Sequence, residues 1–493
     1  MRFLLGAGFG TDNLTAAPTM KGLLFLILAS LALAADRKPN LIYILADDLG
    51  YGELGCYGQK QIMTPELDRM AKEGMRFTQF YAGATVCAPS RSVLMTGLHQ
   101  GHTRVRGNSG IKNPAAQALR KEDLTVAKFL QSAGYRTALI GKWGLGDVGA
   151  AESGLPRRQG FDEFFGFLNQ HHAHNHFPDH LWRNETKEPL PNVVTPVGDQ
   201  GGGYATKKEK FADDLFAEES LRFVERNKDR PFFLYWSMVI PHANNERTAV
   251  FKDGADAPGF GPYAEASWPD PDKGQAALVT LMDSYVGRML RKLRELGIDR
   301  DTLVVFSSDN GPHREAGHDP ERFDPNGPFT GLKRDLTDGG IRVPFIAWWP
   351  GRVRPGSESG HVAYAGDFFA TAAELSGRPV PAGLDSLSFV PTLVGGEGQK
   401  KHEFLYWEFH ERGFQQAALL DGRWKGIRVG GPDRTVRLHD LSADLAEQRD
   451  VAPEHPEVAR KIGDYLKSAR TDADDWKPYW QVPDAKKKAP VSK

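Results

Sequence analysis

The chain has 493 residues, of which 40% are hydrophobic and 25% are charged, a balance typical of an ordinary globular protein. Its 62 Lys and Arg residues against 63 Asp and Glu residues give a formal net charge of −1. This charge provides no overall field that would attract nucleic acid or an anionic membrane surface. We therefore expect neither as a partner, and an anionic substrate would have to be held by a local cluster of cations.

Residues 1–34 have the pattern of an additional N-terminal segment followed by a signal peptide. Lys21 precedes an apolar run over 22–34, and Ala32-Leu33-Ala34 fits a small-x-small cleavage site. At about 13 residues the apolar run is too short to span a bilayer. We expect a periplasmic or secreted protein, cleaved near Ala34 and without a membrane anchor.

Short apolar runs alternate with helical patterns between residues 35 and 400. The runs predict strands at Leu41 to Ala46, Thr137 to Ile140, Pro231 to Val239 and Leu303 to Ser308. Helices are predicted at 64–74 (with Thr64 as N-cap), 90–96, 122–133, 212–227 and 275–297. Such alternation is typical of a layered α/β fold with a buried parallel sheet. We expect one large domain over 35–400.

The pattern changes after about residue 400. Short strand-like runs at 404–407, 415–420, 425–429 and 436–438 are joined by turns, and a polar helix follows over 457–469. They predict a smaller α+β subdomain over 401–480, with a small antiparallel sheet and a helix. The Lys-rich tail over 481–493 is predicted to be disordered.

Polar side chains follow the predicted strands of the large domain where each strand ends. They are Asp47 and Asp48, Lys142, His242, and Asp309 and Asn310. The carboxyl edge of an open α/β sheet is where ligands bind. Three carboxylates and one amide oxygen are hard ligands that suit Ca²⁺ or Mg²⁺, although acidic pairs at strand ends can also be simple solvated caps.

The chain has two cysteines, Cys56 and Cys87. In an exported protein the simplest interpretation of two cysteines is one disulfide bond. Cys87 also stands at a predicted helix start beside Arg91, and that setting would lower the pKa of its thiol and allow it to act as a nucleophile.

The segment Cys87-Ala88-Pro89-Ser90-Arg91, continued by Leu94-Met95-Thr96-Gly97, resembles the signature of the formylglycine-dependent sulfatases. Lys142 in Gly-Lys-Trp, His242 in Ile-Pro-His and Lys333 in Gly-Leu-Lys match further positions of that family. The resemblance covers about residues 40–440. It implies an arylsulfatase-like enzyme with an alkaline-phosphatase-like sheet that carries helices on both faces, so that 35–400 would be the catalytic domain.

The resemblance also implies the parts of the site. A formylglycine-generating enzyme would oxidise Cys87 to an aldehyde, whose hydrate attacks sulfur with one hydroxyl and expels sulfate with the help of the other. Calcium, or magnesium if the cavity is tight, would be held by Asp47, Asp48, residue 87, Asp309 and Asn310. Arg91, Lys142 and Lys333 would hold the negative charge, and His242 or Lys333 would protonate the leaving alcohol.

Two positions depart from the family's pattern. Gly144 stands where a His usually hydrogen-bonds the formylglycine hydroxyl, and this shifts the base function to another group such as Asp309. We expect the missing imidazole to leave space that water or a neighbouring side chain fills. Asp338 stands where the family usually has Glu.

The stretch 169–180 holds five of the chain's 15 histidines. Such a tract can bind zinc or be plain surface polarity. The interpretation we favour is a substrate-recognition loop, because planar donors and aromatic rings suit a sugar. His172 and His174, joined by His313 and His318, are the predicted sugar-binding residues.

The sequence therefore predicts a hydrolase of sulfate monoesters that desulfates a sulfated carbohydrate, taken at a chain end. Two alternatives remain. One is a phosphonate or phosphodiester hydrolase of the same superfold, and the other is an inactive protein that binds sulfated glycans.

Overall fold

The structure, a computed structural model, describes residues 38–108, 113–411, 413–478 and 481. The predicted signal peptide and residues 482–493 of the predicted tail lie outside these ranges. Among the helices of the described part, none is long and apolar enough to cross a membrane.

A ten-stranded mixed sheet forms the centre of the fold. Its order is β13 (Ser357–Ser359), β2 (Met75–Phe77), β12 (Phe345–Trp348), β11 (Thr302–Ser308), β1 (Asn40–Ala46), β10 (Phe232–Ser237), β4 (Arg136–Lys142), β5 (Glu163–Phe167), β6 (His180–Arg183) and β7 (Thr186–Pro189). The run from β11 to β5 is parallel throughout, and β12 and β6 pair antiparallel at either side of it.

The central strand β1 is buried along its whole length and pairs with β11 and β10 on its two sides. Its sequence, NLIYILA, is apolar on both faces because helices cover both faces of the sheet. Ile42 and Ile44 point into one hydrophobic cluster, and Leu41 and Tyr43 point into the other.

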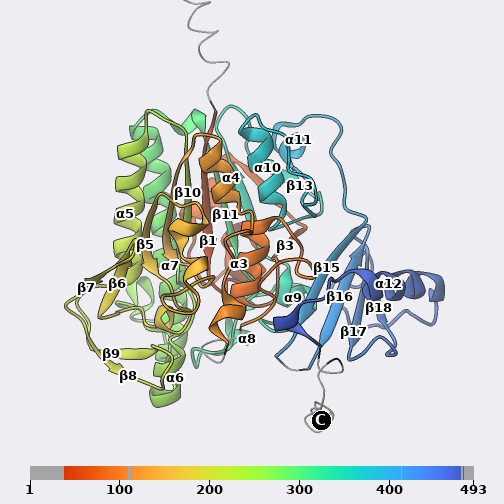
Figure 1. Cartoon of the computed structure of the whole chain (residues 1–493). Coiled ribbons are helices and arrows are strands. Elements are labelled where there is room, and N and C mark those ends of the chain that lie inside the picture. Colours follow the sequence, from red (N-terminus) through yellow and green to blue (C-terminus); the bar gives the residue numbers. More distant parts are fainter. Residues whose placement is uncertain (1–37, 109–112, 412, 479–480, 482–493) are drawn as a thin grey trace, which may run out of the picture. The chain divides into compact units, whose positions relative to one another are not determined.

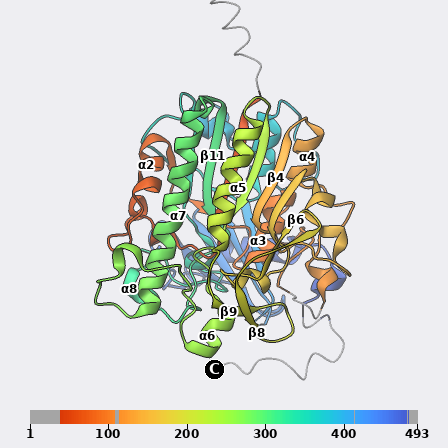
Figure 2. The ribbon, with the colours of Figure 1, turned by 90° about the vertical axis from the view of Figure 1, so that its left-hand side faces the viewer.

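Helices pack on both faces of the sheet (Figure 1, Figure 2). The first cluster is completed by α2 (Pro65–Glu73), α5 (Ala212–Asn227) and α7 (Asp270–Glu295), and the second by α3 (Cys87–Thr96), α4 (Val126–Ser132) and α10 (Asp367–Leu375). The predicted layered α/β sheet with helices on both faces is confirmed.

Shorter elements connect these layers. The strands are β3 (Phe80–Tyr81), β14 (Ala363–Tyr364), β8 (Val193–Pro196) and β9 (Gly203–Lys207), and the helices are α6 (Asn245–Phe251), α8 (Pro320–Phe323), α9 (Asp338–Ile341) and α11 (Val390–Val394). Single 3-10 turns lie at Tyr51–Glu53, Gly55–Tyr57, Pro114–Gln117, Glu152–Gly154, Pro156–Gln159, His172–His174, Gly261–Tyr263, Asp299–Asp301 and Asp474–Trp476.

The C-terminal part is the predicted small α+β unit. Its strands β15 (Phe404–Phe409), β16 (Gln415–Leu420), β17 (Trp424–Val429) and β18 (Arg437–Asp440) form an antiparallel sheet in chain order. Helix α12 (Pro456–Ser468) covers one face with Ile462 and Leu466. Trp407 and Leu419 on the opposite face pack with residues of the larger part.

The beginnings of several helices differ from the sequence prediction, those of α2 and α3 among them. Thr64 occupies the N-cap position of α2, but its hydroxyl oxygen accepts from the backbone of Gly55 at 2.8 Å and does not cap the helix. The Asp283 carboxylate caps it instead, accepting from the backbone N–H groups of Glu66 and Leu67. Helix α3 begins at Cys87, three residues before the predicted start at Ser90.

Candidate active site

Four neighbouring parallel strands end at one edge of the sheet and bring their polar residues together. β1 leads into Asp47 and Asp48, and β11 leads into Asp309 and Asn310. The backbone N–H of Asp48 donates to Oδ1 of Asp309 at 3.0 Å, which joins the two strand ends. Lys142 is the last residue of β4, and His242 follows β10. The predicted convergence of these segments is therefore observed.

Cys87 lies in the first turn of α3 and faces this edge. Its Sγ is 3.3 Å from Oδ1 of Asp47 and 3.8 Å from Oδ1 of Asp48, and its side chain is buried. Burial, and after it the Asp47 carboxylate, raises the pKa of the Cys87 thiol well above its usual range. The lowered pKa expected for this thiol is thus wrong, because helix position counts for less than burial beside carboxylates. Cys56 and Cys87 are both free, so the disulfide interpretation is also wrong.

Two buried lysines neutralise the carboxylates of the aspartate pair. Nζ of Lys142 donates to Oδ2 of Asp47 at 2.6 Å, and Nζ of Lys333 donates to Oδ2 of Asp48 at 2.8 Å. Burial acts to raise the pKa of Asp47, but Lys142, followed by Arg91 and Lys333, outweighs it and holds that pKa below its usual range. Asp47 and Asp48 are therefore carboxylates although both are fully buried.

Arg91 lies among the strand-end residues. Its guanidinium group is fully buried and bonds Oδ2 of Asp309 through Nη2 at 2.8 Å and through Nε at 3.2 Å. Nη1 donates to the carbonyl oxygen of Lys142 at 3.0 Å and to Oγ of Ser237. Its donors are used on the protein itself, so Arg91 orients Asp309 and the end of β4 and does not face a ligand.

His242 is held in one tautomer by its neighbours. Nδ1 lies 2.7 Å from the carbonyl oxygen of Ala243, so Nδ1 carries the proton and donates it. Nε2 therefore presents its lone pair to Nζ of Lys333, which lies 3.2 Å away. Burial, and then the charge of Lys333, lowers the pKa of His242 well below its usual range. The pair consists of a neutral imidazole and a charged ammonium group.

The oxygen atoms at the strand ends fit a hard divalent cation. Oδ1 of Asn310 is buried and has no hydrogen-bond partner among the described residues, whereas its amide nitrogen donates to Oδ1 of Asp48 at 2.6 Å. Burial together with the neighbouring Asp47 raises the pKa of Asp309 to about 7, as expected where three carboxylates lie close together in the interior. An oxygen without a partner beside crowded carboxylates is the donor set that calcium or magnesium prefers.

A hollow of about 910 Å³ opens in front of Cys87, and we call it the Cys87 pocket. The described residues that line it are Cys87, Asn108, Gln117, Gln170, His171, His174, Gln200, His242, Asn245, Lys333, Arg334 and Glu411. Of the predicted site residues, Cys87, His174, His242 and Lys333 line it. Arg91, Lys142 and the four strand-end residues Asp47, Asp48, Asp309 and Asn310 are buried and do not.

A sequence model of the sulfatase family matches residues 39–378, and a second one, described as N-sulphoglucosamine sulphohydrolase, C-terminal, matches residues 330–472. This chain belongs to the sulfatase family. The enzyme is accordingly a sulfuric ester hydrolase, as the sequence predicts.

Proteins similar to this sulfatase match it over most of its length. An N-acetylgalactosamine-6-O-sulfatase of Bacteroides thetaiotaomicron is 28% identical over 88% of this chain and 94% of the relative, and human arylsulfatase A is 32% identical over 82% and 77%. A solved structure from work on the metabolism of multiple glycosaminoglycans by Bacteroides thetaiotaomicron superposes with a TM-score of 0.72 at 27% identity. It covers 89% of this chain and 100% of its own, and it confirms the expected fold.

Three of the four predicted sugar-binding histidines of the sulfatase do not line the Cys87 pocket. His172 is buried, stacks on His180 with ring centroids 4.4 Å apart, and lines a separate hollow. His313 donates from Nε2 to the carbonyl oxygen of Pro241 at 3.1 Å, and His318 packs against its ring. These three support the fold around the site, so the geometry does not favour them as ligands of a substrate at Cys87.

His174 is the predicted histidine that does reach the pocket. Its ring stacks on that of His242, with centroids 4.9 Å apart and planes 12° apart. Nδ1 donates to Oε2 of Glu246 at 3.1 Å, which fixes the ring in this position. His174 is therefore placed to contact a group bound beside His242.

Several pocket residues of the sulfatase were not predicted. Arg334 lines the pocket beside Lys333, and Glu315 joins the two cations from outside the lining, since it accepts from Nζ of Lys333 at 3.1 Å and also pairs with Arg334. Gln170 and His171 belong to the His-rich stretch, but the prediction selected other residues of it. Arg334 adjoins a matched lysine, whereas Asn108 and Glu411 carry no local pattern that would have identified them.

Proposed function

We propose that this sulfatase hydrolyses sulfate monoesters of carbohydrates in the Cys87 pocket, with a formylglycine produced from Cys87. The supporting observation is the position of Cys87 on the first turn of α3, where it lines a polar pocket together with Lys333 and contacts Asp47 and Asp48. A formylglycine-generating enzyme is the maturation partner that this proposal requires.

A formylglycine would supply, in its hydrated form, one hydroxyl that attacks sulfur and a second that allows sulfate to be expelled. The metal would be Ca²⁺, with Mg²⁺ as the alternative, held by Asp47, Asp48, Asp309, Asn310 and the modified residue 87. Bound there, it would stabilise negative charge on the sulfate oxygens. Asn310 supports this assignment, because its buried oxygen is otherwise unsatisfied.

Among the chain's own residues, Lys333 has the central role in the proposed reaction. Nζ of Lys333 lies 3.2 Å from Nε2 of His242 and donates a hydrogen bond to it. Lys333 also lines the pocket. His242 Nε2 accepts a hydrogen bond, so it is not a donor in this arrangement, and Lys333 is the group that can give a proton to the departing alcohol oxygen. Preorganised cations at a site of developing negative charge supply one of the largest catalytic contributions.

A sulfated sugar suits the remaining walls of the pocket. Asn108, Gln117, Gln200 and Asn245 offer amide donors and acceptors, and His174 offers a planar ring. One relative is named as a sulfatase of N-acetylgalactosamine, which favours a carbohydrate substrate. Another is named as an arylsulfatase, which favours an aryl sulfate. The polar lining decides our proposal for the carbohydrate, and the N-terminal segment motivates the further proposal that the enzyme is exported.

Mass spectrometry of the peptide that contains residue 87 tests the nucleophile. We expect the aldehyde in active material and an unmodified thiol in material produced without the generating enzyme. Cys87→Ala should fold normally and lose essentially all turnover. Full activity of a preparation that retains the thiol would contradict the proposal.

Kinetics on three substrate classes separate the alternatives. A sulfated sugar should be hydrolysed with higher kcat/KM than an aryl sulfate or a phenylphosphonate. A preference for the phosphonate would favour the phosphonate or phosphodiester hydrolase. No turnover of any sulfate ester by fully converted enzyme would favour the inactive glycan-binding protein.

A further inference from the structure

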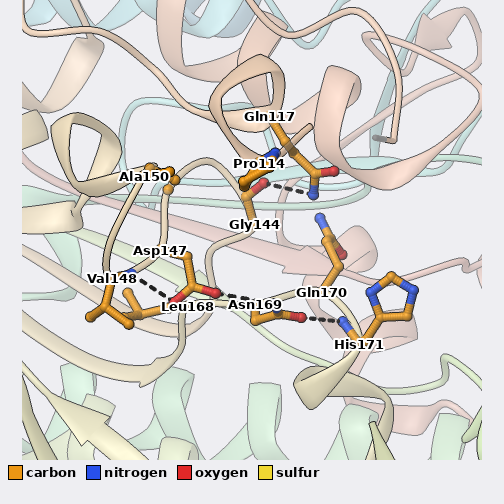
Figure 3. A pocket seen from close by; sticks show the side chains of 12 residues that line it. Pro114, Gln117, Gly144, Asp147, Val148, Ala150, Leu168, Asn169, Gln170 and His171 are labelled. Carbon is orange, nitrogen blue, oxygen red and sulfur yellow. Dashed lines mark hydrogen bonds between the residues drawn. The ribbon is translucent and has the colours of Figure 1, made fainter. Parts of the chain in front are cut away.

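A second hollow, which we call the Gly144 hollow, adjoins the Cys87 pocket. It encloses about 660 Å³ including its open mouth. Gln117, Gln170 and His171 line both hollows, so the two spaces share one wall (Figure 3). A ligand at Cys87 that extends past this wall enters the Gly144 hollow.

Gly144 gives this hollow its form. Its φ of +77° lies in the left-handed region that favours glycine, and a β-carbon here would lie 2.1 Å from Nε2 of Gln170. The space that an imidazole would take is thus filled by a neighbouring side chain, one of the two outcomes expected from the sequence. Figure 3 shows the amide end of Gln170 directed toward Gly144 and Gln117.

Gln170 has an unused donor in this position. Its side chain is 8% exposed, and Nε2 is buried with no hydrogen-bond partner among the described residues. A buried amide without a partner carries a desolvation cost. An oxygen atom of a bound ligand would remove that cost.

The charge of the Gly144 hollow differs from that of the Cys87 pocket. The described residues that line it include neither Lys nor Arg, and Asp147 is their one carboxylate. Asp147 accepts from the Asn169 amide at 3.0 Å, and burial followed by the charge of His174 lowers the pKa of His171 and keeps that ring neutral. A sulfate group would be unfavourable here, whereas hydroxyl groups would find amide and imidazole partners.

We propose that the Gly144 hollow is a subsite for an uncharged, hydroxyl-bearing sugar unit next to the sulfated unit at Cys87, and that Gln170 is its specificity-determining residue. This inference rests on the proposed function. The hydroxyl oxygen accepts from Nε2 of Gln170, so the enzyme favours an oligosaccharide over the sulfated monosaccharide alone.

The test compares N-acetylgalactosamine 6-sulfate with the same unit linked to an unsulfated second sugar. Wild-type enzyme, with residue 87 converted, should show kcat/KM about tenfold higher on the disaccharide. Gln170→Met removes the amide at nearly constant volume, and it should reduce this ratio about five- to tenfold through KM, the size of one hydrogen bond. Because Nε2 of Gln170 has no partner in the part of the chain that the structure describes, thermal stability should stay the same or rise, whereas loss of a structural hydrogen bond would lower it.

A second variant examines the hollow without altering the Cys87 pocket. Ala150 is exposed and lines the Gly144 hollow alone, so Ala150→Trp should fill the hollow and bring the disaccharide-to-monosaccharide ratio toward one. Ala264→Trp, an exposed position that lines neither hollow, is the matched control and should keep the wild-type ratio.

The outcomes separate the two proposals. Equal efficiency of the wild type on both sugars, or a ratio unchanged in both variants, overturns the subsite and leaves the proposed function intact. Turnover of an aryl sulfate but of neither sugar overturns the proposed carbohydrate substrate, and the subsite with it.

Discussion

At the scale of single residues, the described site contains oxygen atoms that the protein itself leaves unsatisfied. Oδ1 of Asn310 lies among the carboxylates of Asp47, Asp48 and Asp309 without a donor, although its amide nitrogen is used twice. Each carboxylate here is buried, and burial raises the free energy of a charged group that lacks full compensation. The folded chain should therefore gain stability from a cation.

The first prediction is that calcium stabilises the folded enzyme. At a concentration one hundred times its dissociation constant, calcium should add about 2.7 kcal/mol to the free energy of unfolding, and EDTA should remove that increment. Asn310→Leu should abolish most of the calcium-dependent rise in Tm, measured by differential scanning fluorimetry, and should lower the metal content found by elemental analysis. Asn245→Ala, which changes the pocket wall but none of the proposed ligands, should keep the rise. Stoichiometric zinc in active enzyme would contradict the assignment.

The site residues that could be located from the sequence are those that directly follow a predicted strand. Asp47 and Asp309 come directly after long apolar strands, and the parallel arrangement of those strands then brings them together. Gln170 and Glu315 could not be found in this way, because they reach the site from loops whose path depends on tertiary contacts. The contacts of Arg91 with Asp309 and with the end of β4 could not be predicted either, since a sequence match does not show which partners its donors reach.

At the scale of elements, an ion pair connects strand β17 of the small sheet to helix α9 of the larger part. Nζ of Lys425 on β17 donates to Oδ1 of Asp338 at 2.7 Å and lies 3.2 Å from Glu447, all within the buried interior. Asp338 begins α9, five residues after Lys333 in the chain. Burial acts to raise the pKa of Asp338, but Lys425 and then Arg342 outweigh it and hold that pKa below its usual range.

The second prediction concerns this buried lysine. Lys425→Met leaves Asp338 and Glu447 without their shared cation, and removal of one partner of a buried pair costs about 3–5 kcal/mol. Chemical denaturation should show the loss. Lys461→Met is the matched control, because Lys461 pairs with Glu403 at the exposed surface and its loss should change stability little. Equal effects of the two changes would contradict the prediction.

The elements that sequence predicted well are those with a strong hydrophobic pattern. β1, β4, β10 and β11 are continuous apolar runs, and α5 was predicted with its observed bounds, 212–227. The hairpin of β8 and β9 was missed because its strands are four and five residues long and mostly exposed, so burial imposes no alternation on them. Helix α4 begins at Val126, four residues after the predicted start, because the Thr125 side chain caps it by accepting from the backbone of Lys128.

At the scale of the described molecule, ion pairs also join the small sheet to segments far away in sequence. Glu408 on β15 is fully buried and lies within 4.0 Å of Arg106, 3.0 Å of Arg470 and 2.9 Å of His410. Burial acts to raise its pKa, but the hydrogen bond and charge of His410, with Arg470 and Arg106, outweigh burial and lower the pKa of Glu408 to about 2.

The third prediction is an acid transition that depends on Glu408. A carboxyl whose pKa falls from about 4.5 unfolded to about 2 folded contributes about 3 kcal/mol at pH 7, and this contribution is lost as pH decreases from 4.5 to 2. Glu408→Gln should therefore destabilise the enzyme at neutral pH and by a smaller amount at pH 3, as measured by urea unfolding at each pH. A destabilisation that is independent of pH would show that Glu408 acts through packing or neutral hydrogen bonds alone.

The hydrophobic core likewise continues from the large sheet region into the small one. One cluster of buried residues combines Tyr81, Val93 and Ile341 of the first 400 residues with Trp407 and Leu419 of the small sheet. The indole N–H of Trp407 donates to the carbonyl oxygen of Ala82 at 2.9 Å, close to the turn that carries Cys87. Without the small sheet this cluster would be exposed to water, together with the partners of Lys425 and Glu408.

The last prediction is that the described part of the chain unfolds as one unit. Differential scanning calorimetry of the enzyme should show a single transition with a calorimetric enthalpy equal to the van't Hoff enthalpy, as cooperative unfolding requires. A chain ending at residue 400 should fail to fold, because its exposed apolar cluster and the loss of Lys425 as a partner of the buried Asp338 both disfavour the native state. Trp407→Ala in the full chain should lower the Tm of that one transition, since loss of a buried Trp costs about 3–5 kcal/mol. Two resolved transitions, with Trp407→Ala shifting only one of them, would show instead that the two sheets unfold independently.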